Sequence, residues 1–143
     1  MAYATITHLT DRIGTTLMIA LTDRGEVPTG AVDTAVVDRA LVDAEALVDG
    51  YLANKYTLPL SDVPGLLVDI TAAIAVWKLY ITDAPDKIRA DYDQAMRSLR
   101  DIADGRIRLV GVAGIEAPTS GAQGVETNDR ERPFTPDNLK GFI

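Results

Sequence analysis

The sequence predicts an all-α fold: a compact bundle of about four or five helices followed by an extended C-terminal arm. Three observations lead to this prediction. Apolar residues recur at steps of three and four in several segments, as they do on one face of an α-helix. These segments are separated by glycines, prolines and capping residues, the usual start and stop signals of helices. Opposite charges four residues apart recur in the most charged segment, which is typical of an exposed helix face.

Two short helices are expected in the first 30 residues. Thr5 is positioned to cap the first, and Gly14 to end it. The second restarts at Thr15 or Thr16 and stops before a polar loop. The apolar residues expected to face the core are Ile6, Leu9 and Ile13 in the first helix and Leu17, Met18, Ile19 and Leu21 in the second. The lone histidine, His8, is expected on the polar side of the first helix.

The polar loop reads Asp23-Arg24-Gly25-Glu26 and only weakly resembles a calcium loop. An EF-hand needs acidic or amide ligands at alternate positions before its glycine, and here Arg24 and Gly25 intrude. We therefore expect no metal site in this loop.

A long amphipathic helix is expected from Asp33, its capping residue, to Leu52. Its apolar residues are Val36, Val37, Ala40, Leu41, Ala44, Leu47, Val48, Tyr51 and Leu52. Its carboxylates mostly occupy the other side. Because no histidine or nucleophile motif accompanies them, a solvated polar face is favoured over a catalytic pair.

The fourth helix is expected to begin after Asp62, its N-cap, with Pro64 in its first turn, and to continue through the apolar stretch Leu66–Ile81. Only Asp69, Thr71 and Lys78 are polar in this range, so the helix must be covered on most sides. At about 100° per residue, Lys78 lies about 180° from Asp69. Two interpretations of Asp69 stay open: it pairs with an arginine of the same or another subunit, or it reaches solvent near the helix start. A catalytic role is a weaker third.

The fifth helix is expected to begin at Asp83-Ala84-Pro85-Asp86, with proline at the first helical position, and to end at Gly105. One face is apolar from Ile88 to Ala103. The other predicts five ion pairs: Lys87–Asp91, Arg89–Asp93, Asp93–Arg97, Arg97–Asp101 and Arg100–Asp104. Trp77 and Tyr80, with Tyr51 and Tyr56, are expected to pack in the core rather than to form a base-stacking platform.

After Gly105 the helical periodicity ends, and glycines and prolines become frequent from Gly114 onward. We therefore divide the chain into a helical body, residues 1–105, and an extended arm, residues 106–143. Arg106–Val110 alternates basic and apolar residues and is compatible with a short strand. Residues 1–105 hold 16 acidic and nine basic side chains, whereas residues 106–143 hold five of each. The arm nevertheless carries both phenylalanines of the chain, so we expect it to dock on a partner through four apolar anchors: Phe134, Leu139, Phe142 and Ile143.

Composition also excludes several classes of function. The 143-residue chain has a net charge of −7, one histidine and no cysteine, so it has no disulfide, thiolate nucleophile or multi-histidine metal site. No phosphate loop or nucleophile elbow is present, so we expect neither an enzyme nor a cofactor. Every run of 18 residues contains a charge, so no membrane helix is predicted. The N-terminus has no basic region followed by an apolar stretch, so no signal peptide is predicted. The acidic balance argues against wrapping of DNA.

Five motifs and their order resemble the head-tail connector (adaptor, neck) proteins of Mu-like tailed phages. They are Met1-Ala2-Tyr3-Ala4-Thr5, "LTDR" at residues 21–24, "DGYLANKYTLPL" at residues 49–60, Val63-Pro64 with the apolar helix behind it, and "LRDIADGRIRL" at residues 99–109. The resemblance covers about residues 1–110. Where that family often has an Asp-rich turn after "LTDR", this chain has only Gly25-Glu26.

The resemblance implies a ring, commonly of twelve copies, that joins the capsid portal to a neck or tail-completion protein and lets genomic DNA pass without binding it specifically. It implies that the protein is located in the host cytoplasm during assembly and in the virion afterwards, and that it has no membrane partner. In such a ring, Asp69, Lys78 and Arg97 are candidate subunit contacts and the arm is a candidate portal contact. The alternative is a small cytoplasmic interaction or regulatory module, antitoxin-like in size, whose tail folds on one partner.

Overall fold

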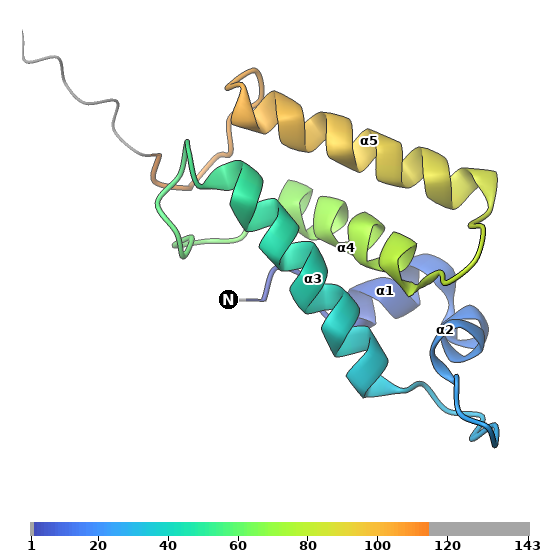
Figure 1. Cartoon of the computed structure of the whole chain (residues 1–143). Coiled ribbons are helices and arrows are strands. Elements are labelled where there is room, and N and C mark those ends of the chain that lie inside the picture. The colour runs from blue at the N-terminus through green and yellow to red at the C-terminus, as the bar shows by residue number, and fades with distance from the viewer. Residues whose placement is uncertain (1, 115–143) are drawn as a thin grey trace, which may run out of the picture.

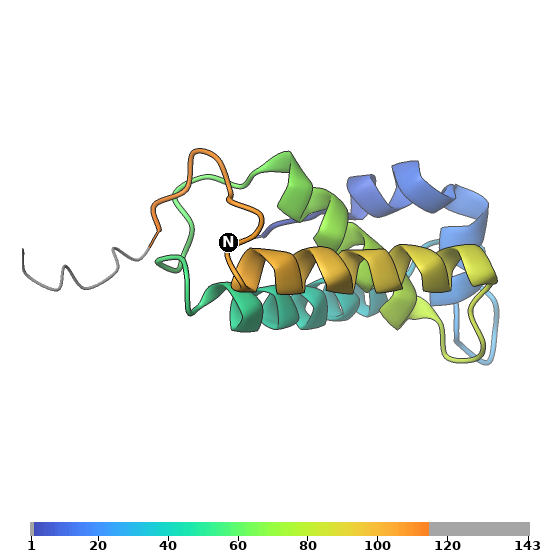
Figure 2. The ribbon, with the colours of Figure 1, turned by 90° about the horizontal axis from the view of Figure 1, so that it is seen from above.

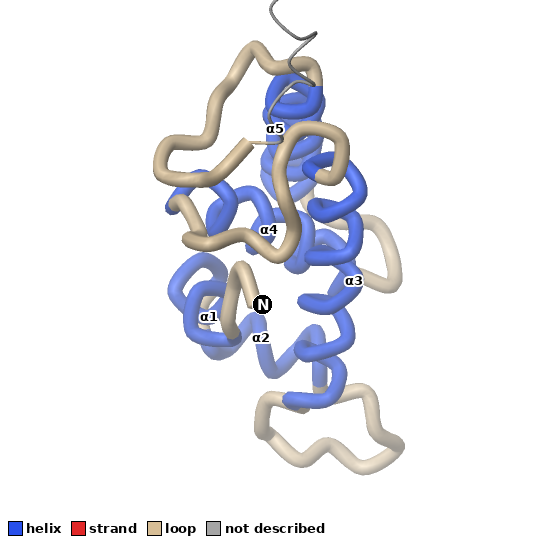
Figure 3. The backbone as a smooth tube through the Cα atoms, turned by 90° about the vertical axis from the view of Figure 1, so that its left-hand side faces the viewer, coloured by secondary structure: helices blue, strands red, loops and turns tan. Residues whose placement is uncertain are grey.

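The computed structural model describes residues 2–114. Within that part the chain is all-α, with the predicted number of helices. They are α1 (Ile6–Ile13), α2 (Thr15–Thr22), α3 (Thr34–Leu52), α4 (Gly65–Leu79) and α5 (Asp86–Ala103). Helix α4 runs through the middle, α5 lies along one side of it, and α3 and α1 lie on opposite flanks (Figures 1, 2 and 3).

Helix α4 forms the centre of the core. Its buried residues are Leu67, Ile70, Thr71, Ala72, Ala73, Ile74, Ala75, Val76 and Leu79. A helix this apolar must be covered on most sides, and the neighbours α3, α5 and α1 provide that cover. The side chains of Ala72, Ala73 and Ala75 are small, so the neighbouring helices can approach closely there. The predicted burial of this helix is thus confirmed.

Several helix boundaries follow the predicted signals. The carboxylate of Asp33 accepts a hydrogen bond from the backbone N–H of Ala35 at 2.9 Å and so caps α3. Gly14, with φ at +82°, separates α1 from α2. At the end of α5, Gly105 has φ at +81° and the N–H of Arg106 donates to the carbonyl of Asp101 at 2.8 Å. This is the Schellman arrangement, which satisfies carbonyls that the helix end leaves free.

Two predicted helix starts were wrong. Helix α4 begins at Gly65 with Pro64 as its N-cap, and the side chain of Asp62 accepts from Val63 N–H instead of capping the helix. Helix α5 begins at Asp86, so Pro85 is the N-cap rather than the first helical residue. In both places the proline has an extended ψ, near +143° and +151°, because the chain turns into the helix only after it. Helix α4 also stops two residues before the predicted end.

Residues 106–114 fold back onto the helical body. Leu109 is buried in the core, and its N–H donates to the hydroxyl of Tyr56 at 2.9 Å. Across residues 2–114 there is no strand; Tyr56 and Gly114 form one isolated antiparallel bridge. The strand suggested over Arg106–Val110 does not form, because the N–H groups of Arg106 and Ile107 close the end of α5. The division at residue 105 stays a prediction, but the core extends past it to Leu109.

The aromatic residues pack in the core as predicted. Tyr56 is buried, and the rings of Trp77 and Tyr92 stack with centroids 4.9 Å apart. Tyr51 and Tyr80 are half-buried against the same cluster. A stack of this kind adds about 0.5–1.5 kcal/mol beyond the area it buries.

We predict that Tyr56→Phe lowers the free energy of unfolding by about 1–3 kcal/mol, because it leaves the buried N–H of Leu109 without an acceptor. Urea unfolding followed by circular dichroism measures the change. Tyr80→Phe removes the same atom from a half-buried tyrosine and serves as the matched control. Equal stability of the two variants would show that the hydrogen bond does not hold the 106–114 segment.

Candidate functional site

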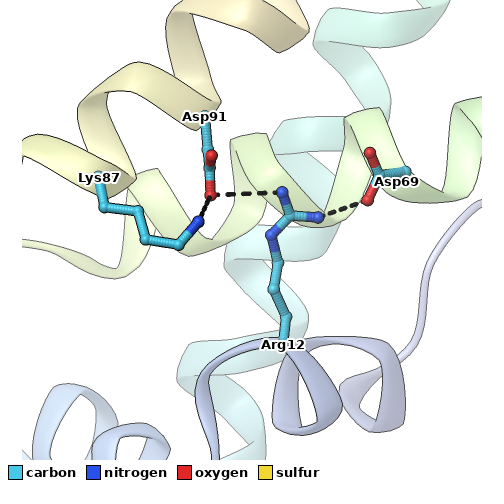
Figure 4. A network of polar contacts seen from close by, with 4 residues as sticks. All are labelled: Arg12, Asp69, Lys87 and Asp91. Atoms are coloured by element: carbon cyan, nitrogen blue, oxygen red, sulfur yellow. Dashed lines mark hydrogen bonds and ion pairs between the residues drawn. The ribbon is translucent and has the colours of Figure 1, made fainter.

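A network of charged side chains joins three helices on the flank formed by α1, α4 and α5 (Figure 4). Arg12 projects from the last turn of α1. Its Nη1 donates to Asp69 Oδ1 of α4 at 2.5 Å, and its Nη2 lies 3.5 Å from Asp91 Oδ2 of α5. Lys87 Nζ donates to the same Asp91 oxygen at 3.0 Å. One guanidinium therefore connects helices that lie 57 and 79 residues away in the sequence.

The two open interpretations of Asp69 are both part of the observed structure. It pairs with an arginine of its own chain, and its side chain is still 70% exposed. Arg12 and Asp91 are more enclosed, at 25% and 27%. The Arg12–Asp69 bond is thus open to screening by salt, and Asp69 keeps acceptor capacity toward solvent.

The electrostatics of Asp91 follow from its neighbours. The hydrogen bond from Lys87 lowers the pKa of the Asp91 carboxyl below its usual 3.8, partial burial opposes this, and the positive charges of Lys87 and Arg12 lower it further. The folded protein therefore favours the ionised form of Asp91.

A second polar contact holds the N-terminal segment against α3. The backbone N–H of Tyr3 donates to Glu45 at 2.8 Å, and the Tyr3 hydroxyl donates to Asp49. Burial and then the hydrogen bond to the Asp49 carboxylate raise the pKa of Tyr3. Glu45 and Asp49, predicted as part of a solvated face, thus anchor this segment.

Lys78 and Arg97 are exposed and take no part in the Arg12 network. Lys78 lines a small cavity between α3 and the end of α4, together with Arg24, Arg39 and Asp43. Arg97 lies on the exposed face of α5. The structure therefore does not bring Asp69, Lys78 and Arg97 together within one chain. The arm anchors Phe134, Leu139, Phe142 and Ile143 lie outside the described residues.

Four of the five ion pairs predicted along α5 do not form. Lys87–Asp91 is present, whereas Asp101 pairs with Arg106 at 3.2 Å instead of with Arg97. Within residues 2–114, Arg89, Arg97 and Arg100 have no carboxylate within 4 Å. Holding two long exposed side chains together costs about as much entropy as the pair gains, so the periodic pattern did not determine the contacts.

The remaining candidate features have local roles. The carboxylate of Asp23 accepts from the N–H groups of Thr29 and Gly30 at 2.8 and 2.9 Å, which closes the polar loop on itself. His8 is exposed, and its Nδ1 accepts from the N–H of Thr5 at 3.0 Å at the start of α1. Over residues 2–114, no three His, Cys, Asp or Glu side chains are grouped so that they could hold a metal ion.

Three further cavities lie between elements of the described part. One of about 560 Å³ separates the ends of α3 and α5 from the 106–114 segment and is lined by Lys55 and Arg108. One of about 520 Å³ lies between α1 and the first half of α4, and one of about 160 Å³ lies between α4 and α5 on the far side of Arg12. In the part of the chain that the structure describes, no helix has the length and apolar character needed to cross a bilayer.

Sequence reasoning missed Arg12, the central residue of the network. Its position in the last turn of a short helix carries no distinguishing signal. The available signal was indirect: Asp69 in a mostly apolar helix indicated an arginine partner as one of two interpretations, but its spacing did not say which arginine.

Comparison with known proteins gives matches over most of the chain. The family model described as Bacteriophage Mu, Gp36 matches residues 3–127. The chain is 34% identical over 143 residues to "Gene product J" of Escherichia phage Mu, with 100% of both chains covered. It is 33% identical over 100 residues to "Mu-like prophage FluMu protein gp36" of Haemophilus influenzae, with 70% of each chain covered.

We predict that Arg12→Gln lowers the free energy of unfolding by about 1 kcal/mol at low salt, because it removes the cation that connects α1 to α4 and α5. A double-mutant cycle with Asp69→Asn should give a coupling of about 0.5–1 kcal/mol that shrinks at about 1 M NaCl. Arg97→Gln is the control, with no expected change. A coupling of zero at low salt would mean that Asp69 and Arg12 are independent.

The pKa of Asp91 predicts a dependence of stability on pH. Since the folded pKa lies below the unfolded value, the stabilisation is present above about pH 4 and is lost as the pH falls through the lower folded pKa. Asp91→Asn should therefore flatten the fall in Tm between about pH 5 and pH 2. Asp93→Asn, exposed on the same helix, should leave the wild-type slope. Parallel curves for Asp91→Asn and the wild type would refute the assignment.

Proposed function

The chain belongs to the Bacteriophage Mu Gp36 family of phage proteins, and from this membership we propose that it is a structural head-tail connector of the phage particle. As a connector it forms a ring, with twelve copies as the expected number, beneath the capsid portal. It joins the portal to a neck or tail-completion protein. It is assembled in the host cytoplasm, becomes part of the virion and catalyses no reaction.

The observation that carries the proposal is the order of motifs over residues 1–110, which resembles that of head-tail connectors, in a chain that matches a phage Mu protein along its full length. A helical core with α4 at its centre suits a small rigid adaptor.

The charge distribution supports the proposal that DNA passes through the ring without binding to it. Residues 1–105 hold 16 acidic and nine basic side chains, and most of these carboxylates are exposed. A channel with net negative walls repels phosphates and lets the duplex slide without a specific contact.

The candidate subunit contacts are available for assembly. Asp69, Lys78 and Arg97 are all exposed in the single chain, and Asp69 is only partly engaged by Arg12. We propose that they face neighbouring copies.

The portal contact is assigned to the arm. We propose that Phe134, Leu139, Phe142 and Ile143 supply apolar anchors that bury against the portal when the arm folds on it. Coupled folding of this kind suits a segment with few, spaced apolar residues.

We predict that the full chain mixed with portal forms a complex whose mass, measured by light scattering, corresponds to a ring of copies on one portal. Truncation after Gly114 should leave helical content and Tm unchanged, because it keeps every buried residue of the described part, and should abolish portal attachment. Replacing both Phe134 and Phe142 with Ala is the milder variant of the same test, and Arg89→Ala on α5 is its control. Persistent one-to-one binding to a partner that is absent from the virion would instead favour a cytoplasmic regulatory module.

A further inference from the structure

A cationic cavity lies on the α3 flank of the molecule. Arg24, Arg39 and Lys78 come from three different elements and line a space of about 90 Å³ that holds one carboxylate, Asp43. Arg24 is fixed in place: its Nε donates to the carbonyl of Leu21 at 2.9 Å and its Nη2 to that of Leu79 at 2.6 Å. Throughout residues 2–114, neither Arg39 nor Lys78 has a carboxylate within 4 Å. The cavity therefore carries excess positive charge on a chain of net charge −7.

An acidic hollow lies on the α1 flank. It measures about 520 Å³ and is lined by Asp11, Asp69, Arg12 and His8. The single guanidinium of Arg12 is shared between Asp69 and Asp91, so the two carboxylates of the hollow outnumber the one arginine that lines it. Its apolar floor is formed by Val68 and Ala72, which suit the aliphatic stem of a long cationic side chain.

The two features face away from each other. Asp69 and Lys78 are nine residues apart on α4, which is about two and a half turns, so they lie on opposite sides of the helix axis. Helices α1 and α3 accordingly lie on opposite sides of α4 (Figures 2 and 3). Unlike surfaces on opposite sides of one chain make head-to-tail contacts between copies, and such contacts close into a ring when the rotation between copies allows it.

We infer that the cationic cavity of one copy packs against the acidic hollow of the next, so that Lys78 and Arg39 face Asp11 and Asp69. The inference deepens the proposed connector function and rests on it. The partner at each surface is a second copy of the chain, because every copy presents both the cationic cavity and the acidic hollow. Duplex DNA is the disfavoured occupant, since the cavity is small and the surrounding carboxylates repel phosphates.

Charge reversal with rescue tests this contact on the full chain. Lys78→Glu should weaken association between copies at least ten-fold, as measured by sedimentation velocity with and without portal. Adding Asp11→Lys to the same chain should restore association, because the reversed pair attracts again. Arg89→Glu on the exposed face of α5 makes an equal charge change and should have no effect. Circular dichroism checks that every variant is folded.

Thiol cross-linking gives a second readout that leaves all four charged residues in place. The natural chain has no cysteine, so Thr7→Cys on α1 combined with Val42→Cys on α3 reports only the designed contact. Both positions are exposed, and a short bis-maleimide should yield a ladder of linked copies because the contact is head-to-tail. The control pair, Val42→Cys with Ala90→Cys on α5, should yield no ladder.

The outcomes separate the inference from the connector proposal. Rings that form on the portal with wild-type affinity in Lys78→Glu, and that give no Thr7–Val42 ladder, would overturn the inference and leave the connector function standing. A ladder and a charge rescue without any portal binding would support the contact and overturn the connector. Loss of duplex DNA binding in Lys78→Glu, with association unchanged, would identify a phosphate site and overturn the inference.

Discussion

The burial of α4 is the constraint on which the rest of the structure depends. This 15-residue helix has nine buried residues, so it cannot exist in water without neighbours on nearly every side. Helices α3 and α5 cover it over most of its length, and the short α1 covers part of the remaining surface. Each fully buried Leu or Ile side chain contributes about 1.5–3 kcal/mol, so the three covering helices are held mainly by this shared apolar surface.

The weakest of these covers is α1, and polar contacts compensate for its small apolar face. Leu9 is its one buried residue, and its attachment is completed by the contacts of Arg12 with Asp69 and Asp91. Just before α1, Tyr3 contacts Glu45 and Asp49 of α3. Two charged residues of α4, Asp69 and Lys78, then reach the surface only where the covering helices leave gaps. Core packing thus determines where the charges of the central helix are presented, and it presents them on opposite flanks.

The placement of these charges suits the adaptor role that we propose. A phage protein of the Mu Gp36 family that works as an adaptor needs contacts between identical copies and a surface that does not hold DNA. Exposed carboxylates on the body fit the second need, and the opposed cationic cavity and acidic hollow are our proposal for the first. Helix α4 contributes to both surfaces, since Lys78 lines the cationic cavity and Asp69 lines the acidic hollow.

The sequence by itself determined the helices and their inward faces, because periodicity and capping are local properties: Asp33 caps α3, Gly14 and Gly105 end helices, and Trp77 and Tyr56 pack in the core. It also singled out Asp69 as the odd residue of an apolar helix, with pairing to an arginine and exposure to solvent both left open. Only the tertiary structure decided that the partner is Arg12, 57 residues away, that Leu109 bonds to Tyr56, and that Lys87–Asp91 forms where its neighbouring pairs do not. Spacing tells which face of a helix a residue occupies, whereas contacts between distant segments depend on how the helices pack, and exposed charges are too weakly held for spacing to determine their partners.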